Sequence, residues 1–122
     1  MNVALWVVQL LTALAFGQHG YSMLFGVERA RERMAWTRDV ETGLLRFIGV
    51  AEIVGAVGVI LPAATGVLPW VSVLAAGGLV IIMVLAIVFH LFRHEWPNIA
   101  LNFVLGLFAA IVAYGRLASA PS

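Results

Sequence analysis

The sequence contains no cysteine and no lysine, and only 11% of its residues are charged. Soluble globular proteins have about 25% charged residues. The absence of cysteine excludes disulfide exchange, thiol catalysis and thiolate metal sites. The net charge of +1 is too small to indicate nucleic-acid binding, so no nucleic acid is expected as a partner. The chain also has no serine nucleophile elbow, no phosphate-binding loop and no HExxH sequence, and its residues therefore show no catalytic motif.

Long apolar runs occupy most of the chain, which is 63% hydrophobic. The four runs are 3–25, 44–61, 67–92 and 98–115. Each is close to the ~20 residues that a helix needs to cross the hydrocarbon core of a bilayer. Because short turns make consecutive helices antiparallel, the sequence predicts a single domain, residues 1–122, with an all-α fold: an integral membrane antiparallel four-helix bundle. Pro62 is expected to end the second helix, and Pro69 and Pro97 to lie in first helical turns.

Most of the charged residues lie in the segment 27–42, between the first two runs. Val27, Ala30 and Met34 share one face of a helix there, with Trp36 close by. This pattern favours a short helix at the membrane interface. A solvated loop fits the same composition equally well, and the sequence leaves the two alternatives open.

The arginines predict the orientation in the membrane, because cytoplasmic loops are enriched in basic residues. One side of the predicted bundle carries six of the seven arginines and the opposite side carries only Arg116. Both termini of the multi-pass protein are therefore expected outside the cytoplasm. The six arginines are Arg29, Arg31, Arg33, Arg38, Arg46 and Arg93.

Glu52 is an acid in the middle of the second apolar run. A charged side chain at that depth costs roughly 2.5–3.5 kcal/mol on insertion scales, so Glu52 is expected to face the bundle interior and to have a partner. We interpret it as a functional residue that accepts a proton, faces a ligand or anchors a polar layer. At a rise of about 1.5 Å per residue, His19, His90 and Asn102 fall at the same level as Glu52.

Six residues are candidates for ligand binding or proton handling: Glu52, His19, His90, Asn102, Arg46 and Gln18. Simpler roles remain open for most of them. Asn102 and Gln18 fit interhelical hydrogen bonding, His90 fits an inward role or a position reaching water, and Arg46 fits contact with lipid headgroups. No metal site is predicted, because the two histidines and the acid lie on three helices without local ligand spacing.

The segment 45–62 reads LRFIGVAEIVGAVGVILP and resembles the signature of DoxX-like membrane proteins. Thr65-Gly66, Pro69-Trp70 and the closing 113–116 also fit this resemblance, which covers nearly the whole chain. The first helix differs, since His19-Gly20 stands where such proteins commonly have an ending with lysine. The resemblance implies a small bacterial four-helix membrane protein, which is therefore expected in the inner membrane of the cell. The family name derives from a quinone-linked thiosulfate-oxidising subunit, and some members associate with redox-defence proteins.

Two functions follow as expectations. The first is an accessory or interaction subunit of a membrane assembly, including a redox-linked one. Its contacts would be the lipid bilayer, partner proteins or further copies of the chain. The second is a site for a quinone or another lipid-like molecule in the polar layer around Glu52, serving binding, catalysis or transport. No cofactor is evident from the residues, although the second function would admit a quinone. Whether the protein is an enzyme stays open.

Overall fold

The structure is a computed structural model, and it describes residues 3–119. The described chain is helical almost throughout and contains five α-helices and one short 3-10 helix. Four of the α-helices are long and apolar enough to cross a membrane, which confirms the predicted all-α membrane bundle. In chain order the elements are α1 (Val3–Phe25), α2 (Val27–Arg33), the 3-10 helix η1 (Ala35–Asp39), α3 (Thr42–Thr65), α4 (Trp70–Phe92) and α5 (Trp96–Ser119).

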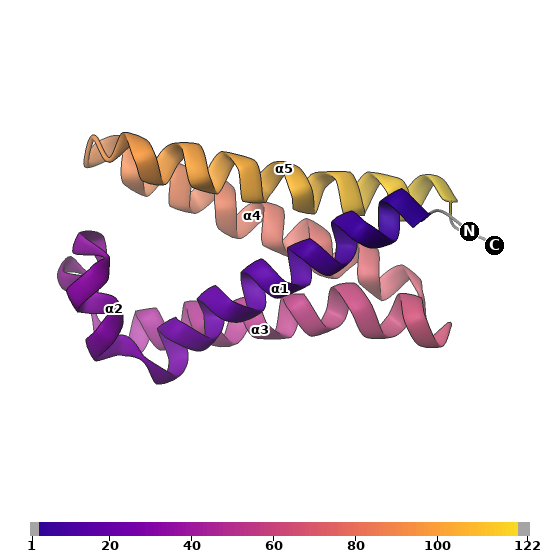
Figure 1. Ribbon diagram of the computed structural model, residues 1–122, viewed down its shortest axis with the longest axis horizontal. Coiled ribbons are helices and arrows are strands. Elements are labelled where there is room, and N and C mark those ends of the chain that lie inside the picture. The colour runs from indigo at the N-terminus through magenta and orange to yellow at the C-terminus, as the bar shows by residue number, and fades with distance from the viewer. Residues whose placement is uncertain (1–2, 120–122) are drawn as a thin grey trace.

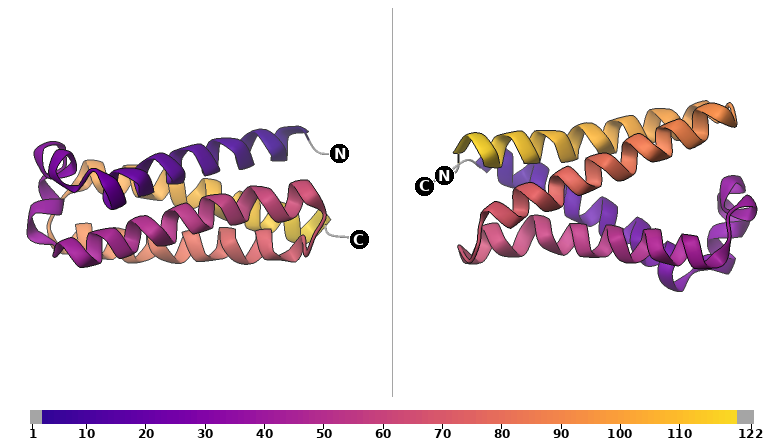
Figure 2. Two further views of the ribbon diagram at one scale, coloured as in Figure 1. Left: turned by 90° about the horizontal axis from the view of Figure 1, so that it is seen from below. Right: turned by 180° about the vertical axis from the view of Figure 1, so that it is seen from behind.

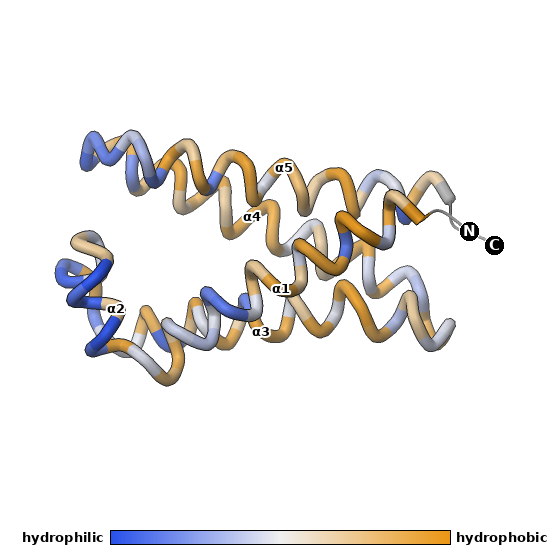
Figure 3. Tube along the Cα trace, in the orientation of Figure 1, coloured by the Kyte–Doolittle hydropathy of each residue, from blue (hydrophilic) through white to orange (hydrophobic). Residues whose placement is uncertain are grey.

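The four long helices form two antiparallel pairs, α1 with α3 and α4 with α5 (Figure 1). The pairs lie close together at the end where α1 begins, and they diverge toward the end that carries α2, η1 and the α4–α5 turn (Figure 2). We call this second end the α2 end. Hydrophilic residues concentrate at the α2 end, whereas the long helices are mostly hydrophobic along their middle (Figure 3).

Two glycines bring the backbones of α1 and α3 into direct contact. A Cβ atom on Gly49 would lie 2.7 Å from the carbonyl oxygen of Gly20, and a Cβ on Gly20 would lie 2.8 Å from the carbonyl oxygen of Gly49. These distances are too short for any side chain, so only glycine fits both positions. Small residues allow this close approach of membrane helices. The crossing holds α1 against the stretch of α3 that carries Glu52.

The expectation that Pro62 ends the second helix is wrong, because α3 continues to Thr65. Proline has no N–H for the carbonyl oxygen four residues earlier and normally breaks a helix interior. Here Ser72 of α4 donates its hydroxyl to the carbonyl oxygen of Gly58 at 3.0 Å and accepts the backbone N–H of Ala63 at 3.1 Å. These bonds satisfy the backbone groups that Pro62 leaves unpaired, as membrane helices require.

The carbonyl oxygen of Val59, which loses the N–H of Ala63, also has a substitute donor. Gln9 of α1 donates its amide to this oxygen at 2.5 Å and accepts Nε–H of Arg116 at 2.7 Å. The guanidinium of Arg116 lies 4.6 Å from the ring centroid of Trp6. Polar side chains from three helices thus support the end of the bundle opposite α2, which is why these residues lie inside an otherwise apolar core.

The connection between α1 and α3 is a short amphipathic helix followed by η1, and it is not an irregular loop. Val27 and Ala30 of α2 are buried together with Trp36 of η1, and they pack against Met23 and Leu45. Arg38 holds the fold of this segment by donating Nε–H to the carbonyl oxygen of Arg31 at 2.6 Å. The apolar face that the sequence indicated therefore packs on the bundle itself.

Candidate functional site

Glu52 is 1% exposed and lies at the interface of α1 and α3. Its Oε1 atom lies 2.6 Å from Nδ1 of His19. A contact this short requires one proton between the two groups, because a carboxylate and an unprotonated ring nitrogen are both acceptors. The close crossing at Gly20 and Gly49 positions the pair, since it sets the adjacent residues of the two helices side by side.

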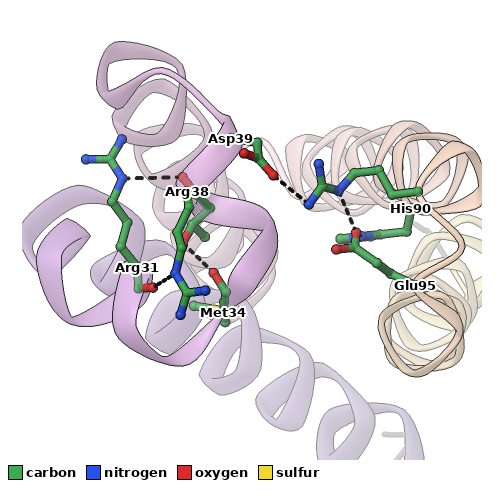
Figure 4. A network of polar contacts seen from close by, with 8 residues as sticks. Arg31, Met34, Arg38, Asp39, His90 and Glu95 are labelled. Carbon is green, nitrogen blue, oxygen red and sulfur yellow. Dashed lines mark hydrogen bonds and ion pairs between the residues drawn. The ribbon is translucent and has the colours of Figure 1, made fainter.

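A second histidine–carboxylate pair lies at the α2 end. Nδ1 of His90 is 2.7 Å from Oε1 of Glu95, which also accepts Nε–H of Arg93 at 3.0 Å. The Nη2 atom of Arg93 is 2.8 Å from Oδ2 of Asp39, and this ion pair joins η1 to the α4–α5 turn (Figure 4). The hydrogen bond from Arg93 is the main cause that holds the pKa of Glu95 below its usual value.

Trp36 lies between the two histidines. Its ring stacks on His19 with 6.5 Å between centroids, and it meets His90 edge-on at 5.5 Å. The same ring contacts Phe89 at 6.0 Å. A residue of the α1–α3 connection thereby covers the interior of the bundle where the helix pairs diverge. The sequence placed Trp36 only near the membrane interface, because nothing local shows that η1 folds back over the core.

A cavity of about 390 Å³ opens beneath Trp36, between α1, α3, α4 and α5. Its volume lies within the roughly 300–1,000 Å³ of small-molecule pockets. Most lining side chains are apolar. The polar ones converge from four helices, and they are His19, Glu52, His90, Asn98 and Asn102.

The rim of the cavity is apolar and exposed. Leu44 and Phe47 of α3 are 51% and 68% exposed, and Leu101 of α5 is 55% exposed. In a membrane-spanning bundle, side chains of this kind on the outer face meet lipid chains. The cavity therefore has a side that faces the hydrocarbon, and a polar interior behind it.

The structure brings four of the six candidate residues to this cavity: Glu52, His19, His90 and Asn102. The other two, Gln18 and Arg46, are exposed and do not line it. His90 is 3% exposed, so it points inward, and its carboxylate partner is Glu95 in place of Glu52. Within residues 3–119, no group of three histidine, aspartate or glutamate side chains could hold a metal ion.

Sequence reasoning missed three contributors to the site, Trp36, Glu95 and Asn98. Glu95 lies in the turn before α5, and Asn98 lies in the first turn of α5. The spacing of five residues between His90 and Glu95 is no helical contact distance, and only the turn that interrupts the helix brings the two side chains together. The left-handed backbone of His94, with φ 57°, is part of that turn.

Comparison with known proteins gives one match. No curated protein and no solved structure matches the chain. The profile described as the DoxX-like family matches residues 7–112, which include every residue that lines the cavity. The match covers most of the sequence, and with four membrane-spanning helices in the expected order, the chain belongs to the DoxX-like family.

Proposed function

We propose that this small membrane protein binds a lipid-like small molecule in the cavity at the α2 end, with the His19–Glu52 pair as its polar anchor. The observation that carries the proposal is the cavity itself, about 390 Å³ in volume and lined by apolar side chains around a few convergent polar ones. Pockets that bind small molecules have this composition, because apolar walls supply affinity and a few polar groups set the orientation.

The position of the rim supports a ligand that arrives from the bilayer. A molecule that enters past Phe47 and Leu101 keeps its apolar part among lipid-facing side chains while its polar part reaches Glu52. A quinone is one molecule of this shape. Its carbonyl oxygens would accept hydrogen bonds from the imidazole of His90 or from the amides of Asn98 and Asn102.

The chemistry of Glu52 also favours a ligand over a purely structural role. An interhelical hydrogen bond in a membrane needs only an amide or a hydroxyl and contributes on average about 0.6 kcal/mol. An acid adds an insertion cost of roughly 2.5–3.5 kcal/mol without strengthening that bond by as much. A titratable group at the wall of a cavity is therefore better explained by binding or proton transfer.

The alternative function, an accessory subunit of a membrane assembly, stays a prediction. The exposed arginines of α2, Arg29 and Arg33, offer a polar surface to a partner protein. Such a role is compatible with an occupied cavity, because a bound lipid and a bound protein would use different parts of the molecule. One experiment can detect both a bound lipid and a bound partner protein.

The test is native purification in a mild detergent, followed by mass spectrometry of the lipids and proteins that co-purify. We expect the wild-type protein to carry an enriched small molecule that Glu52→Gln, a nearly isosteric change, loses while its thermal stability is kept. The matched control is Glu28→Gln, because Glu28 is exposed on α2 and does not line the cavity. A Glu52→Gln protein with normal stability and the same bound molecule would contradict the proposal.

A further inference from the structure

We infer that the molecule held in the cavity is a lipophilic cation, meaning an organic ammonium or phosphonium ion with apolar substituents. The inference rests on the proposed function and narrows it to one chemical class. The observations that carry it are the balance of charge around the cavity and the aromatic side chains in its wall.

Among the described residues that line the cavity, Glu52 is the only one with a formal charge, and none is an arginine. The two imidazoles come from α1 and α4, and the amides of Asn98 and Asn102 come from α5. At the edge, the single guanidinium of Arg93 is shared between Glu95 and Asp39. Arg46, on the same helix as Glu52, is exposed and lies outside the lining.

This arrangement leaves the interior acidic unless it takes up a positive charge. Protons on the imidazoles of His19 and His90 are one source of that charge. A bound cation is the other, because a buried carboxylate is stable only when it is paired. An anion would meet the carboxylate of Glu52 with no arginine in the lining to balance the added negative charge, and a neutral molecule would leave the carboxylate dependent on the proton that it shares with His19.

The wall supplies faces that attract a cation. Phe16, Trp36, Phe47 and Phe89 line the cavity together with Glu52. Aromatic rings attract cations through the negative potential of their faces, and the attraction is stronger where water is excluded. Cages of such rings recognise quaternary ammonium groups. Phe89 already interacts with a cation, since the guanidinium carbon of Arg93 is 5.4 Å from its centroid.

Binding and protonation then compete for one carboxylate. His19 and Glu52 share one proton when the site is empty, since their atoms lie 2.6 Å apart. A monocation that pairs with Glu52 replaces that proton, which leaves to the solvent, so the charge of the site is unchanged.

The test uses tetraphenylphosphonium and tetraphenylborate, two ions of the same shape and opposite charge. Their binding to the purified full-length protein is measured by equilibrium dialysis in detergent micelles, with protein-free micelles as the blank. We expect saturable binding of the cation and no saturable binding of the anion. Glu52→Gln should weaken cation binding at least tenfold, whereas Glu28→Gln should leave it unchanged.

A second variant keeps the test valid if Glu52→Gln fails to fold. Glu52→Asp keeps the negative charge, so it should still prefer the cation over the anion. Wild-type protein that binds the anion as tightly as the cation overturns the inference. If neither ion binds while a neutral lipid co-purifies, this inference fails and the proposed function stands. If neither ion binds and no small molecule co-purifies, both fail.

Discussion

At the scale of single residues, each of the two histidines that line the cavity bonds to a carboxylate, but the two carboxylates differ in their exposure to solvent. His19 bonds to an acid that is 1% exposed, whereas Glu95, the partner of His90, is 20% exposed and also bonds to Arg93. Glu95 lies outside the membrane-spanning helices, in the turn after α4, whereas His90 is in the last turn of α4. The Arg93–Asp39 contact, next to this pair, links η1 to the same turn, so its charges affect how Trp36 is held over the cavity.

This arrangement predicts a pH dependence of stability. The pKa of Glu95 is lowered by the hydrogen bond from Arg93, and that of an unfolded chain is about 4.3. The stabilisation by the ionised Glu95 is therefore complete above pH 4.3. It is lost as the pH falls through the lower pKa that Glu95 has in the folded protein. Because solvent reaches both Glu95 and Arg93 and screens their charges, we expect the effect on stability to be small.

Thermal unfolding in detergent between pH 6 and pH 3 measures the effect. Glu95→Gln should be less stable than the wild-type protein at pH 6, and the difference should shrink toward pH 3. Glu28→Gln is the control, and its stability should follow that of the wild-type protein at every pH. A constant difference between Glu95→Gln and the wild-type protein across the range would show that the charge of Glu95 does not stabilise the turn.

At the scale of elements, Ser72 of α4 allows α3 to continue past Pro62. Its hydroxyl bonds to the carbonyl oxygen of Gly58 and the backbone N–H of Ala63, two groups that lack helical partners beside a proline. The same hydroxyl joins the α1–α3 pair to the α4–α5 pair at the end where the two pairs lie close. The divergence at the α2 end, and with it the cavity, starts from this contact.

We predict that Ser72→Ala lowers the free energy of unfolding by about 1–2 kcal/mol, because it leaves the carbonyl oxygen of Gly58, which has no N–H donor at Pro62, without a partner. In a Pro62→Ala background the loss should be smaller, since residue 62 then donates its own N–H to Gly58. A double-mutant cycle measured by denaturant titration in micelles gives this coupling. Ser22→Ala is the control on α1, where the hydroxyl makes no such bond. Additive effects of the two changes would contradict the explanation.

At the scale of the whole molecule, six arginines gather at one end of the bundle. They lie on α2, η1, the start of α3 and the α4–α5 turn. The start of α1 at Val3 and the end of α5 at Ser119 lie at the opposite end of the bundle (Figure 1). The cavity lies in the half of the bundle that these arginines mark. The orientation in the membrane stays a prediction that rests on the enrichment of basic residues in cytoplasmic loops.

A reporter enzyme that is active only outside the cytoplasm tests this orientation. We expect activity when the reporter is fused after Ser122, and none when it is inserted beside Arg33, an exposed residue at the end of α2. Western blotting of both fusions controls for expression. The reverse pattern would place the α2 end and the cavity outside the cytoplasm, and it would leave the helix count unaffected.

The sequence by itself determined that the chain is an integral membrane protein, that it has four long helices and that Glu52 faces inward. These follow from the length of the apolar runs and from the cost of a charge in lipid, which depend on composition and spacing alone. It also predicted that His19, His90 and Asn102 reach the level of Glu52, because depth in a straight helix is set by residue number.

Only the tertiary structure decided how these groups pair. His19 bonds to Glu52 because Gly20 and Gly49 bring α1 onto α3, and His90 bonds to Glu95 because a turn folds back at that point. The cavity exists because the α1–α3 pair and the α4–α5 pair diverge. No local sequence pattern encodes the angle between the two pairs. The position of Trp36 depends likewise on the packing of α2 and η1 against the bundle. Contacts between segments far apart in the chain fix these features, whereas residue spacing fixes only the faces and depths from which they are built.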